Sequence, residues 1–363
     1  MHIVFEGEIF ARQAFGGISR YFAELSRGFL QRGHSVTNIC PLQVNQYIET
    51  IPGINHIGFR VPLLPKSNRT RAFLSNRIAR YIRINSGDIF HETYYRNIRR
   101  SQKMPFVTTI YDMIYEKSGE KFHDLDYMIR AKRQSLENAD QVICISEWTR
   151  NDLLNVYPQF ENKSVVIHLG NRGFEEEEIP FKQEPKHPFL LYVGLRGGYK
   201  NFEILIESFS TIYSKNTNIS LAIFGGPALS NEELSIFAKF ALPPNSYLHI
   251  TGSDKILAWL YKNAIAFIYP SLSEGFGMPL VEAMSQKCPV ICSNASCFPE
   301  VCGDAAIYFD PSSKEDLSEK IRSVIEYSVD ERAHLVTKGL ARSSIFSWDR
   351  CVDKTLATYQ QLL

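Results

Sequence analysis

The chain alternates short apolar runs with amphipathic stretches along most of its length. Runs such as HIVFEG and PFVTTIYD are apolar on both faces, whereas ISRYFAELSRGFL repeats its apolar residues with the period of a helix. Strands that alternate with helices of this length imply right-handed crossovers and parallel sheets. Strands that are apolar on both faces need helices on both sides of the sheet. The alternation therefore predicts a doubly wound α/β architecture.

One stretch interrupts this alternation. Residues 171–188, NRGFEEEEIPFKQEPKHP, contain four consecutive glutamates, three prolines and no apolar periodicity, which is typical of a linker. A chain of 363 residues is long enough for two domains. We therefore predict Rossmann-like domains over residues 1–172 and 187–347. A last helix-like stretch, residues 348–363, could pack on either domain.

The amino-acid composition indicates which broad class of protein this is. A hydrophobic content of 44% and a charged content of 22% are those of a folded globular protein. The sequence has no uninterrupted apolar window of about 18 residues, and its start lacks the order of a secretory signal. We expect a cytoplasmic protein. The seven cysteines suggest reduced, buried thiols, and the spacing of Cys288, Cys292, Cys297 and Cys302 does not suggest a metal site.

The net charge of +1 conceals an asymmetry. Residues 1–172 hold 23 Lys and Arg against 16 Asp and Glu, which is +7, and the remainder holds 17 against 23, which is −6. Within residues 60–100, ten basic side chains face two acidic ones. This excess suggests an anionic partner or peripheral contact with an anionic membrane, although a solvated basic face is an alternative.

Ligands of doubly wound sheets bind beyond the carboxyl ends of the strands, near helix N-termini, and two facing domains would form a cleft there. Gly16 and Gly17 follow the first strand and precede a helix, so their backbone could approach an anion closely. A simple turn is the alternative. Arg196 and Lys200 flank a glycine pair after the strand FLLYVG and could clamp a diphosphate. Otherwise they are ordinary surface charges.

The stretch PSLSEGFGMPLVEAM, residues 270–284, combines a glycine turn, a helix start and two acids. Amides at the start of the helix favour phosphate. The acids Glu274 and Glu282 would repel phosphate, so hydrogen bonds to sugar hydroxyls suit them better. A ligand with a phosphate centre and hydroxylated ends has the layout of a nucleotide sugar. The free amides of Gly277 and Met278, with Pro279 and Leu280 as their neighbours, would face this ligand.

The spacing of the two acids resembles the E-x7-E motif of the family 4 glycosyltransferases, which are retaining enzymes of the GT-B fold. Four further segments are similar to the family's sequences in the same order: GGISRYFAEL, VICISEWTRNDL, YVGLRGGYKN and CPVICSN with FPEVCGDAAIYFDP. The combination resembles bacterial enzymes that build exopolysaccharide or O-antigen chains. The resemblance implies two Rossmann-like domains facing each other across a cleft, with the C-terminal helix crossing back to the first domain.

The resemblance also implies roles for individual residues. Glu282 would hold the donor ribose, and Glu274 would contact the transferred sugar. Gly275, Phe276 and Gly277 would line the pocket of that sugar. Arg196 and Lys200 would neutralise the diphosphate, assisted by Gly17. The base would lie near Gly252, Ser253 and Ile256.

The acceptor side departs from the family pattern. Tyr111, before Asp112, stands where many relatives have a histidine that points into the cleft. Tyr111 could hydrogen-bond there but could not act as an imidazole base. His91 also follows a strand and could partly replace that histidine, or it could be a packed core residue. Asp124 and Asp126 superficially match the D-x-D motif of metal-dependent enzymes. However, Asp124 directly precedes an amphipathic helix, so we interpret it as the N-cap of that helix.

The sequence thus indicates a retaining transferase that moves a hexosyl group from UDP- or GDP-hexose to a glycan or lipid-diphosphate-linked acceptor. It should lie in the cytoplasm, with the inner face of the plasma membrane as a candidate location. Cations and helix dipoles would do the work of a metal ion at the diphosphate, so no cofactor is expected. No nucleic acid partner is expected either. Two alternatives are a nucleotide-sugar 2-epimerase of the same fold and a catalytically inactive nucleotide-sugar-binding protein.

Overall fold

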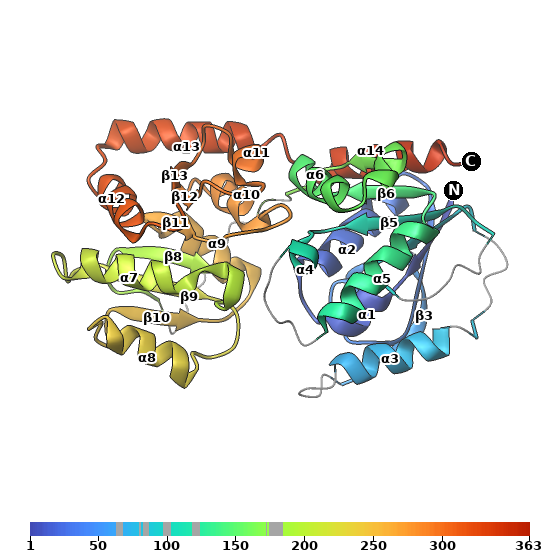
Figure 1. Cartoon of the computed structure of the whole chain (residues 1–363), viewed down its shortest axis with the longest axis horizontal. Helices are drawn as coiled ribbons and strands as arrows, with labels where there is room; N and C mark the ends of the chain where they lie inside the picture. Colours follow the sequence, from blue (N-terminus) through green and yellow to red (C-terminus); the bar gives the residue numbers. More distant parts are fainter. Residues whose placement is uncertain are drawn as a thin grey trace. The chain divides into compact units, whose positions relative to one another are not determined.

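The computed structural model describes residues 1–62, 68–79, 81–82, 87–96, 103–117, 124–171, 173 and 184–363. The chain forms two compact units, one of Met1–Gly170 with Ser347–Leu363 and one of Asn171–Phe346. The second unit thus begins at Asn171, earlier than the predicted start at position 187. Each unit is a parallel sheet between helices (Figure 1).

The first unit contains a seven-stranded sheet in the order β3-β2-β1-β4-β5-β6-β7. Its strands are β1 (His2–Glu6), β2 (Ser35–Gln43), β3 (Asn55–Arg60), β4 (Ile89–Glu92), β5 (Phe106–Ile110), β6 (Gln141–Cys144) and β7 (Ser164–Val166). Its helices are α1 (Glu8–Arg12), α2 (Gly17–Gln31), α3 (Asn68–Ala79), α4 (Ile114–Lys117), α5 (Leu125–Asn138), α6 (Glu147–Val156) and α14 (Trp348–Gln360), with 3-10 turns η1 (Ile48–Thr50) and η2 (Pro158–Lys163). Asp124 occupies the N-cap position of α5.

The second unit contains a six-stranded sheet in the order β10-β9-β8-β11-β12-β13. Its strands are β8 (Phe189–Val193), β9 (Ser220–Phe224), β10 (Tyr247–Ile250), β11 (Ala266–Tyr269), β12 (Val290–Ser293) and β13 (Ile307–Phe309). Its helices are α7 (Phe202–Tyr213), α8 (Asn231–Lys239), α9 (Asp254–Asn263), α10 (Met278–Ser285), α11 (Phe298–Cys302), α12 (Lys314–Ile325) and α13 (Val329–Ser343), with the 3-10 turn η3 (Gly198–Lys200).

The pairing confirms the predicted parallel, doubly wound sheets. Neighbouring strands are parallel in both units, for example β1 with β4 and β8 with β11. β5, β8 and β9 are buried along their whole length, as strands covered on both faces must be. In each sheet the strand order reverses once, between β1 and β4 and between β8 and β11. Ligands of such sheets bind beyond the carboxyl ends of the strands at that reversal.

Helix α14 packs in the first unit, against α2. A Cβ on Gly28 would lie 2.4 Å from Val352 Cγ2, so only a glycine allows the two helices to approach this closely. Arg32 Nε donates to Asp353 Oδ1 at 2.7 Å, and Tyr359 is fully buried. The helix therefore contributes to the core of the first unit although it follows the second unit in sequence.

Three findings bear on the class of protein. In the part of the chain that the structure describes, no helix has both the length and the apolar character that a membrane crossing needs. The seven cysteines are free and buried, as the sequence suggested. Within the same described ranges, no group of three or more His, Cys, Asp or Glu side chains could hold a metal ion.

Candidate active site

The site lies in the second unit, at the reversal between β8 and β11. The loop after β8 carries Tyr199 and Lys200, and the loop after β11 carries Leu272 and Glu274. The Leu272 amide donates to the Tyr199 carbonyl at 2.7 Å, which joins the two loops. Ser296, after β12, fixes the second loop because its hydroxyl donates to the Glu274 carbonyl at 2.6 Å. Hydrogen bonds between loops thus hold the predicted site residues in place.

Lys200 and Glu274 form an ion pair, with Lys200 Nζ 2.5 Å from Glu274 Oε1. The side chains are 16% and 14% exposed, so both are shielded but reachable. The Tyr269 hydroxyl donates to the same oxygen at 2.9 Å. Burial and the nearby Glu274 carboxylate raise the Tyr269 pKa well above its ordinary value, so the hydroxyl stays a donor. The structure therefore brings together a cation and a carboxylate that were predicted to contact the same ligand.

A glycine turn follows Glu274 and leads into helix α10. Gly277 is its N-cap and has φ +80°, a conformation that favours glycine. The helix begins at Met278, with Pro279 as its second residue. The first amides of a helix attract anions because they lack partners within the helix.

Three of the motif residues are buried. Glu282 is 7% exposed, and the Tyr261 hydroxyl lies 3.4 Å from its Oε2. Phe276 packs edge-on against Phe346. Leu280 has no exposed surface, and its amide donates to the Gly277 carbonyl at 2.9 Å. The expectation that Leu280 lines the ligand is therefore wrong, because its side chain packs in the core and its amide is bonded within the turn.

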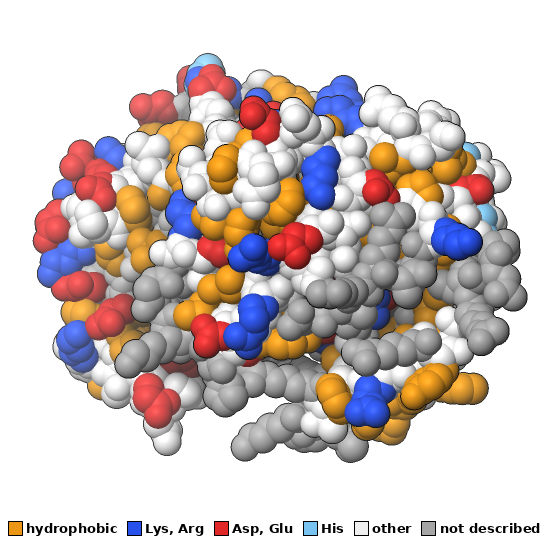
Figure 2. Space-filling view, turned by 45° about the vertical axis from the view of Figure 1, so that its right-hand side comes forward, with side chains coloured by type: hydrophobic (Ala, Val, Ile, Leu, Met, Phe, Trp, Pro, Cys, Tyr) orange, Lys and Arg blue, Asp and Glu red, His pale blue; other side chains and the backbone are white. Residues whose placement is uncertain are grey.

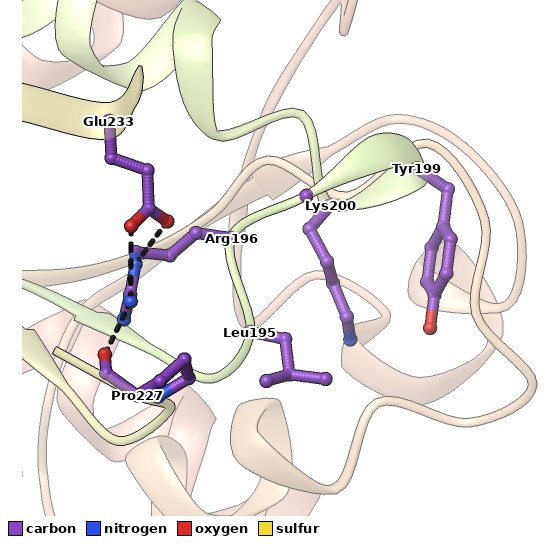
Figure 3. A pocket seen from close by; sticks show the side chains of 7 residues that line it. Leu195, Arg196, Tyr199, Lys200, Pro227 and Glu233 are labelled. Atoms are coloured by element: carbon purple, nitrogen blue, oxygen red, sulfur yellow. Dashed lines mark hydrogen bonds and ion pairs between the residues drawn. The ribbon is translucent and has the colours of Figure 1, made fainter. Parts of the chain in front are cut away.

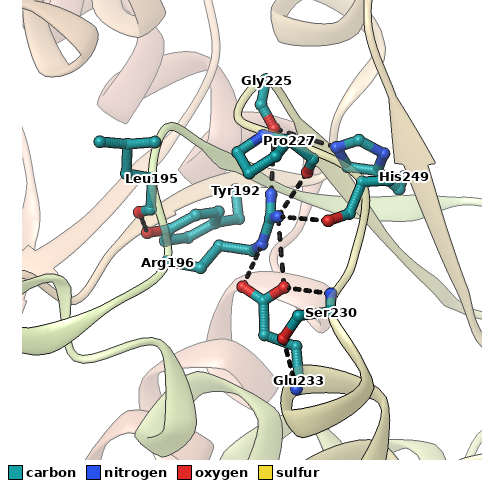
Figure 4. A network of polar contacts seen from close by, with 9 residues as sticks. Tyr192, Leu195, Arg196, Gly225, Pro227, Ser230, Glu233 and His249 are labelled. Carbon is teal, nitrogen blue, oxygen red and sulfur yellow. Dashed lines mark hydrogen bonds and ion pairs between the residues drawn. The ribbon is translucent and has the colours of Figure 1, made fainter. Parts of the chain in front are cut away.

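Arg196 is engaged by protein groups instead of standing free. Its Nε lies 2.6 Å from Glu233 Oε1, and its remaining nitrogens donate to the carbonyls of Gly225 at 3.0 Å and Pro227 at 2.5 Å (Figure 4). Burial opposes ionisation of Glu233, but hydrogen bonds from Arg196 and the Ser230 amide outweigh it and lower the Glu233 pKa. Arg196 thus connects the loop after β8 to the loop after β9 and to the start of α8.

A pocket of about 320 Å³ lies between these two ion pairs. Figure 3 shows Lys200 and Tyr199 on one side of it and Arg196 with Glu233 on the other. Leu195 and Pro227 complete the wall with apolar surface. The combination of charged groups with small apolar surfaces is typical of a site that orients a ligand by a few polar contacts.

The predicted base region lies on the same edge of the sheet. Gly252 and Ser253 are exposed just after β10, and Ile256 is half-buried in the first turn of α9. A Cβ on Gly252 would lie 2.5 Å from Ile256 Cδ1, so these two residues are in contact. His249, on β10, has Nε2 3.0 Å from the Gly225 carbonyl, which also accepts from Arg196. A chain of contacts therefore runs from Arg196 through Gly225 to β10.

The remaining predicted residues lie in the first unit. Gly17 is the first residue of α2 and Gly16 is its N-cap. The side chain of Gln13 reaches this helix start, where its Oε1 accepts from the Ser19 amide at 3.3 Å. A protein group therefore satisfies one of the amides that were expected to receive an anion.

His91 is a packed core residue, which is the alternative that the sequence left open. It is fully buried, with Nδ1 2.6 Å from the Tyr359 hydroxyl and Nε2 2.9 Å from Thr109 Oγ1. Burial lowers its pKa to about 3. The suggestion that His91 faces the acceptor is therefore wrong, because both ring nitrogens are bonded inside the core.

Tyr111 and Asp112 are also bonded within the first unit. The Tyr111 hydroxyl donates to the Thr93 carbonyl at 2.9 Å, and the side chain is 7% exposed. Asp112 Oδ1 accepts from the Ile114 amide at 3.1 Å. The Tyr111 hydroxyl therefore points into protein and not toward a ligand. Asp112 is partly exposed and keeps its predicted place after β5.

Sequence reasoning missed four residues around the site: Tyr199, Glu233, Tyr269 and Ser296. Glu233 had a signal, because S-N-E-E is a capping box and the structure contains both of its hydrogen bonds. Tyr269 is the last residue of β11, a position that points to the ligand edge. The contacts of Tyr199 and Ser296 depend on loop conformation, for which the sequence has no signal.

Comparison with known sequences identifies the family to which the chain belongs. The pattern described as Glycosyltransferase Family 4 matches residues 15–170, and the pattern described as Glycosyl transferases group 1 matches residues 173–342. The chain belongs to the family 4 glycosyltransferases. The family's two patterns fall on the two units, and the second pattern contains the whole of the site described above.

The individual proteins that the chain resembles have low sequence identity to it. O-antigen chain mannosyltransferase B of Escherichia coli is 28% identical over 271 residues, which are 70% of each chain. Sucrose-phosphate synthase of Thermosynechococcus elongatus has a TM-score of 0.78 at 17% identity and covers 99% of this chain and 98% of its own. Anabaena HepE, solved in complex with UDP and glucose, has a TM-score of 0.72 at 16% identity over 99% and 100% of the two chains. These structures show that the family 4 chain has the GT-B fold.

Proposed function

We propose that this glycosyltransferase moves a hexosyl group from a UDP- or GDP-hexose to a glycan or lipid-diphosphate-linked acceptor in polysaccharide biosynthesis, with retention of the anomeric configuration. The observation that carries the proposal is the contact of Lys200 with Glu274 beside the start of α10. A cation, helix amides and a carboxylate within one site suit a ligand with a phosphate next to a sugar. The O-antigen mannosyltransferase and the UDP complex of HepE support the substrate class by analogy.

The donor would span the carboxyl edge of the second sheet. Lys200 and the first amides of α10 would hold the diphosphate. Glu274 would accept hydrogen bonds from the hydroxyls of the transferred sugar, and Glu282 would do so for the ribose. The base would lie toward Gly252. In this arrangement Arg196 reaches the diphosphate only after it exchanges Glu233 for a phosphate oxygen, since its nitrogens are bonded to protein groups.

The chemical step would be a front-face displacement. The bond from the anomeric carbon to the diphosphate breaks, and the acceptor oxygen bonds to the same face of that carbon. The acceptor proton passes to the departing phosphate oxygen. Lys200 leaves Glu274 to stabilise the diphosphate charge, and one such preorganised donor lowers the barrier by about 3–4 kcal/mol. Because lysine and helix amides supply this stabilisation, we propose that no divalent metal is needed.

The test uses the purified full chain and a panel of UDP-, GDP- and ADP-hexoses. The correct donor should raise the melting temperature, because it binds only the folded state. Product formation with a glycan acceptor should yield the donor's anomeric configuration by NMR, and excess chelator should not reduce the rate. An inverted product would overturn the retaining mechanism. Donor binding without turnover would favour the inactive binding protein, and epimerised donor without acceptor would favour the epimerase.

We also propose that the enzyme works in the cytoplasm at the inner face of the plasma membrane, where a lipid-diphosphate-linked acceptor would be presented. Fractionation of cells that express the full chain, with detection in the cytoplasmic and inner-membrane fractions, tests this location. Recovery of the protein outside the cytoplasm would contradict it.

A further inference from the structure

The inner face of helix α3 carries small or polar side chains. Ala72 and Ser75 are buried, and the Ser75 hydroxyl accepts from the Leu42 amide of β2 at 3.2 Å. Arg71 is 6% exposed, with Nε donating to the Ala11 carbonyl at 2.8 Å. Asn76 donates to Glu8 Oε2 at 2.9 Å. The helix is therefore held to the first unit by hydrogen bonds and small side chains.

The outer face of α3 is apolar. Phe73 is 60% exposed, Leu74 46% and Ile78 45%, and Tyr81, just beyond the helix, is 84% exposed. Residues 73 and 77, and likewise 74 and 78, are one helical turn apart, so they share this face. Figure 2 shows hydrophobic side chains gathered at the lower right, over α3, with a basic side chain among them. A surface helix normally buries its apolar face, so α3 has the opposite orientation.

Basic charge accompanies this apolar face. The Arg77 guanidinium lies 5.8 Å from the centre of the Phe73 ring. Ten Lys and Arg occur within residues 60–100 against two Asp and Glu. Two of these arginines point inward, since Arg71 is bonded as described and Arg96 lies 3.3 Å from Glu6. The side chains of Lys66, Arg69, Arg80, Arg83, Arg99 and Arg100 lie outside the described residues.

We propose that α3 is a membrane-contact helix that lies in the plane of an anionic lipid surface. Phe73, Leu74, Ile78 and Tyr81 enter the interface, and Arg77 meets lipid phosphates. The charge favours this occupant. Residues 60–100 hold ten basic side chains against two acidic ones, so a second copy of the chain would bring like charge against like charge, whereas anionic lipid neutralises the excess. The inference gives the membrane location in the proposed function a physical basis. Its test needs no substrate, so the two can fail separately.

The experiment measures sedimentation of the full chain with vesicles of phosphatidylcholine, alone or mixed with phosphatidylglycerol. The parent should bind the anionic vesicles, with binding weakened by salt. The triple change Phe73→Ser, Leu74→Ser, Ile78→Ser should reduce binding about tenfold or more. Arg77→Glu should reduce binding to anionic vesicles several-fold without changing the melting temperature. The matched control is Leu234→Ser with Val329→Ser, two exposed apolar residues of the second unit, which should bind like the parent.

A second readout guards against misfolding of the triple variant. The change Phe73→Trp should shift the fluorescence to shorter wavelength when anionic vesicles are added, because the indole enters an apolar environment. Three outcomes would overturn the proposal. They are equal binding of parent and triple variant, salt-insensitive binding to neutral vesicles, and a dimer in sedimentation equilibrium that the triple change dissociates. The last outcome would identify the face as a contact between copies.

Discussion

Lys200 Nζ contacts Glu274 Oε1 at 2.5 Å, although 74 residues separate the two in the sequence. Both residues follow strands that lie side by side, β8 and β11, and both point to the carboxyl edge of the second sheet. The Tyr269 hydroxyl donates a hydrogen bond to the same Glu274 oxygen. The reaction that we propose requires this ion pair to open, so its two members are the first targets for mutation.

Replacement of Glu274 should slow sugar transfer far more than it weakens donor binding. Glu274→Gln keeps an oxygen for the Tyr269 hydroxyl but removes the charge beside Lys200 and the transferred sugar. We expect kcat to fall by about 100-fold or more, with the donor dissociation constant changed only a few-fold. Steady-state kinetics with the donor identified above, together with calorimetric titration of that donor, measures both.

The control for this change is Glu207→Gln. It removes another Glu–Lys ion pair of the second unit, with Lys314, away from the pocket. Its kinetics should match the parent. Equal loss in both variants, or full activity in Glu274→Gln, would remove the role assigned to Glu274.

Release of Arg196 should tighten donor binding. Glu233→Gln removes the carboxylate that holds Arg196 but keeps an amide able to complete the capping box with Ser230. The buried guanidinium then lacks its counter-charge and should attract the diphosphate more strongly. We expect donor affinity to rise by about three- to tenfold. If calorimetry finds the affinity unchanged, Arg196 is a structural connection between loops and not a phosphate ligand.

The turn before α10 should tolerate only glycine at position 277. Gly277→Ala places a side chain at φ +80°, with its Cβ 2.9 Å from Leu280 Cδ1. We expect a loss of about 1–2 kcal/mol of unfolding free energy in the second unit, and weaker donor binding because the helix start shifts. Thermal melting with and without donor measures both effects.

Gly197→Ala is the comparison for that change. Its φ is −100° and a Cβ there meets open space, so stability should stay at the parent value or rise slightly. Equal destabilisation of the two variants would show that the effect at position 277 is not specific to its backbone conformation.

The buried His91 should make the first unit sensitive to acid. Its pKa is about 3 when folded and 6.5 ordinarily, so below pH 6.5 the unfolded chain takes up a proton that the folded chain does not. Stability is therefore lost as the pH falls from 6.5 toward 3, by about 1.4 kcal/mol per pH unit. Between pH 6.5 and 5 the parent should lose about 2 kcal/mol more than His91→Gln, in urea unfolding monitored by a probe in the first unit. Parallel pH profiles of parent and variant would contradict this assignment.

Much of the fold, and the positions of several candidate site residues, could be predicted from local sequence. Alternating strands and helices fix a doubly wound sheet, because parallel strands need crossovers of that length. Gly277 and Pro279 mark the turn and the start of α10, and position after a strand indicated Lys200 and Glu274. The strand order between β8 and β11 was not predictable, because pairing between distant strands has no local signal.

The errors share one cause. His91, Tyr111 and Leu280 occupy the sequence positions expected of ligand contacts, but their side chains are bonded or packed inside the protein. Sequence position indicates which edge of a sheet a residue occupies, and the direction of its side chain depends on neighbours from other elements. Tyr359 illustrates this, since it lies 268 residues from His91 in the sequence and holds its ring in the core.

The sequence by itself determined the class of architecture, the family resemblance and the chemical types present at the site, because strand and helix periods and short motifs are local properties. Only the tertiary structure decided which charges meet. It pairs Lys200 with Glu274 and Arg196 with Glu233, and it turns the apolar side of α3 outward. Such choices depend on contacts between segments far apart in the chain, where packing and desolvation act on several elements at once.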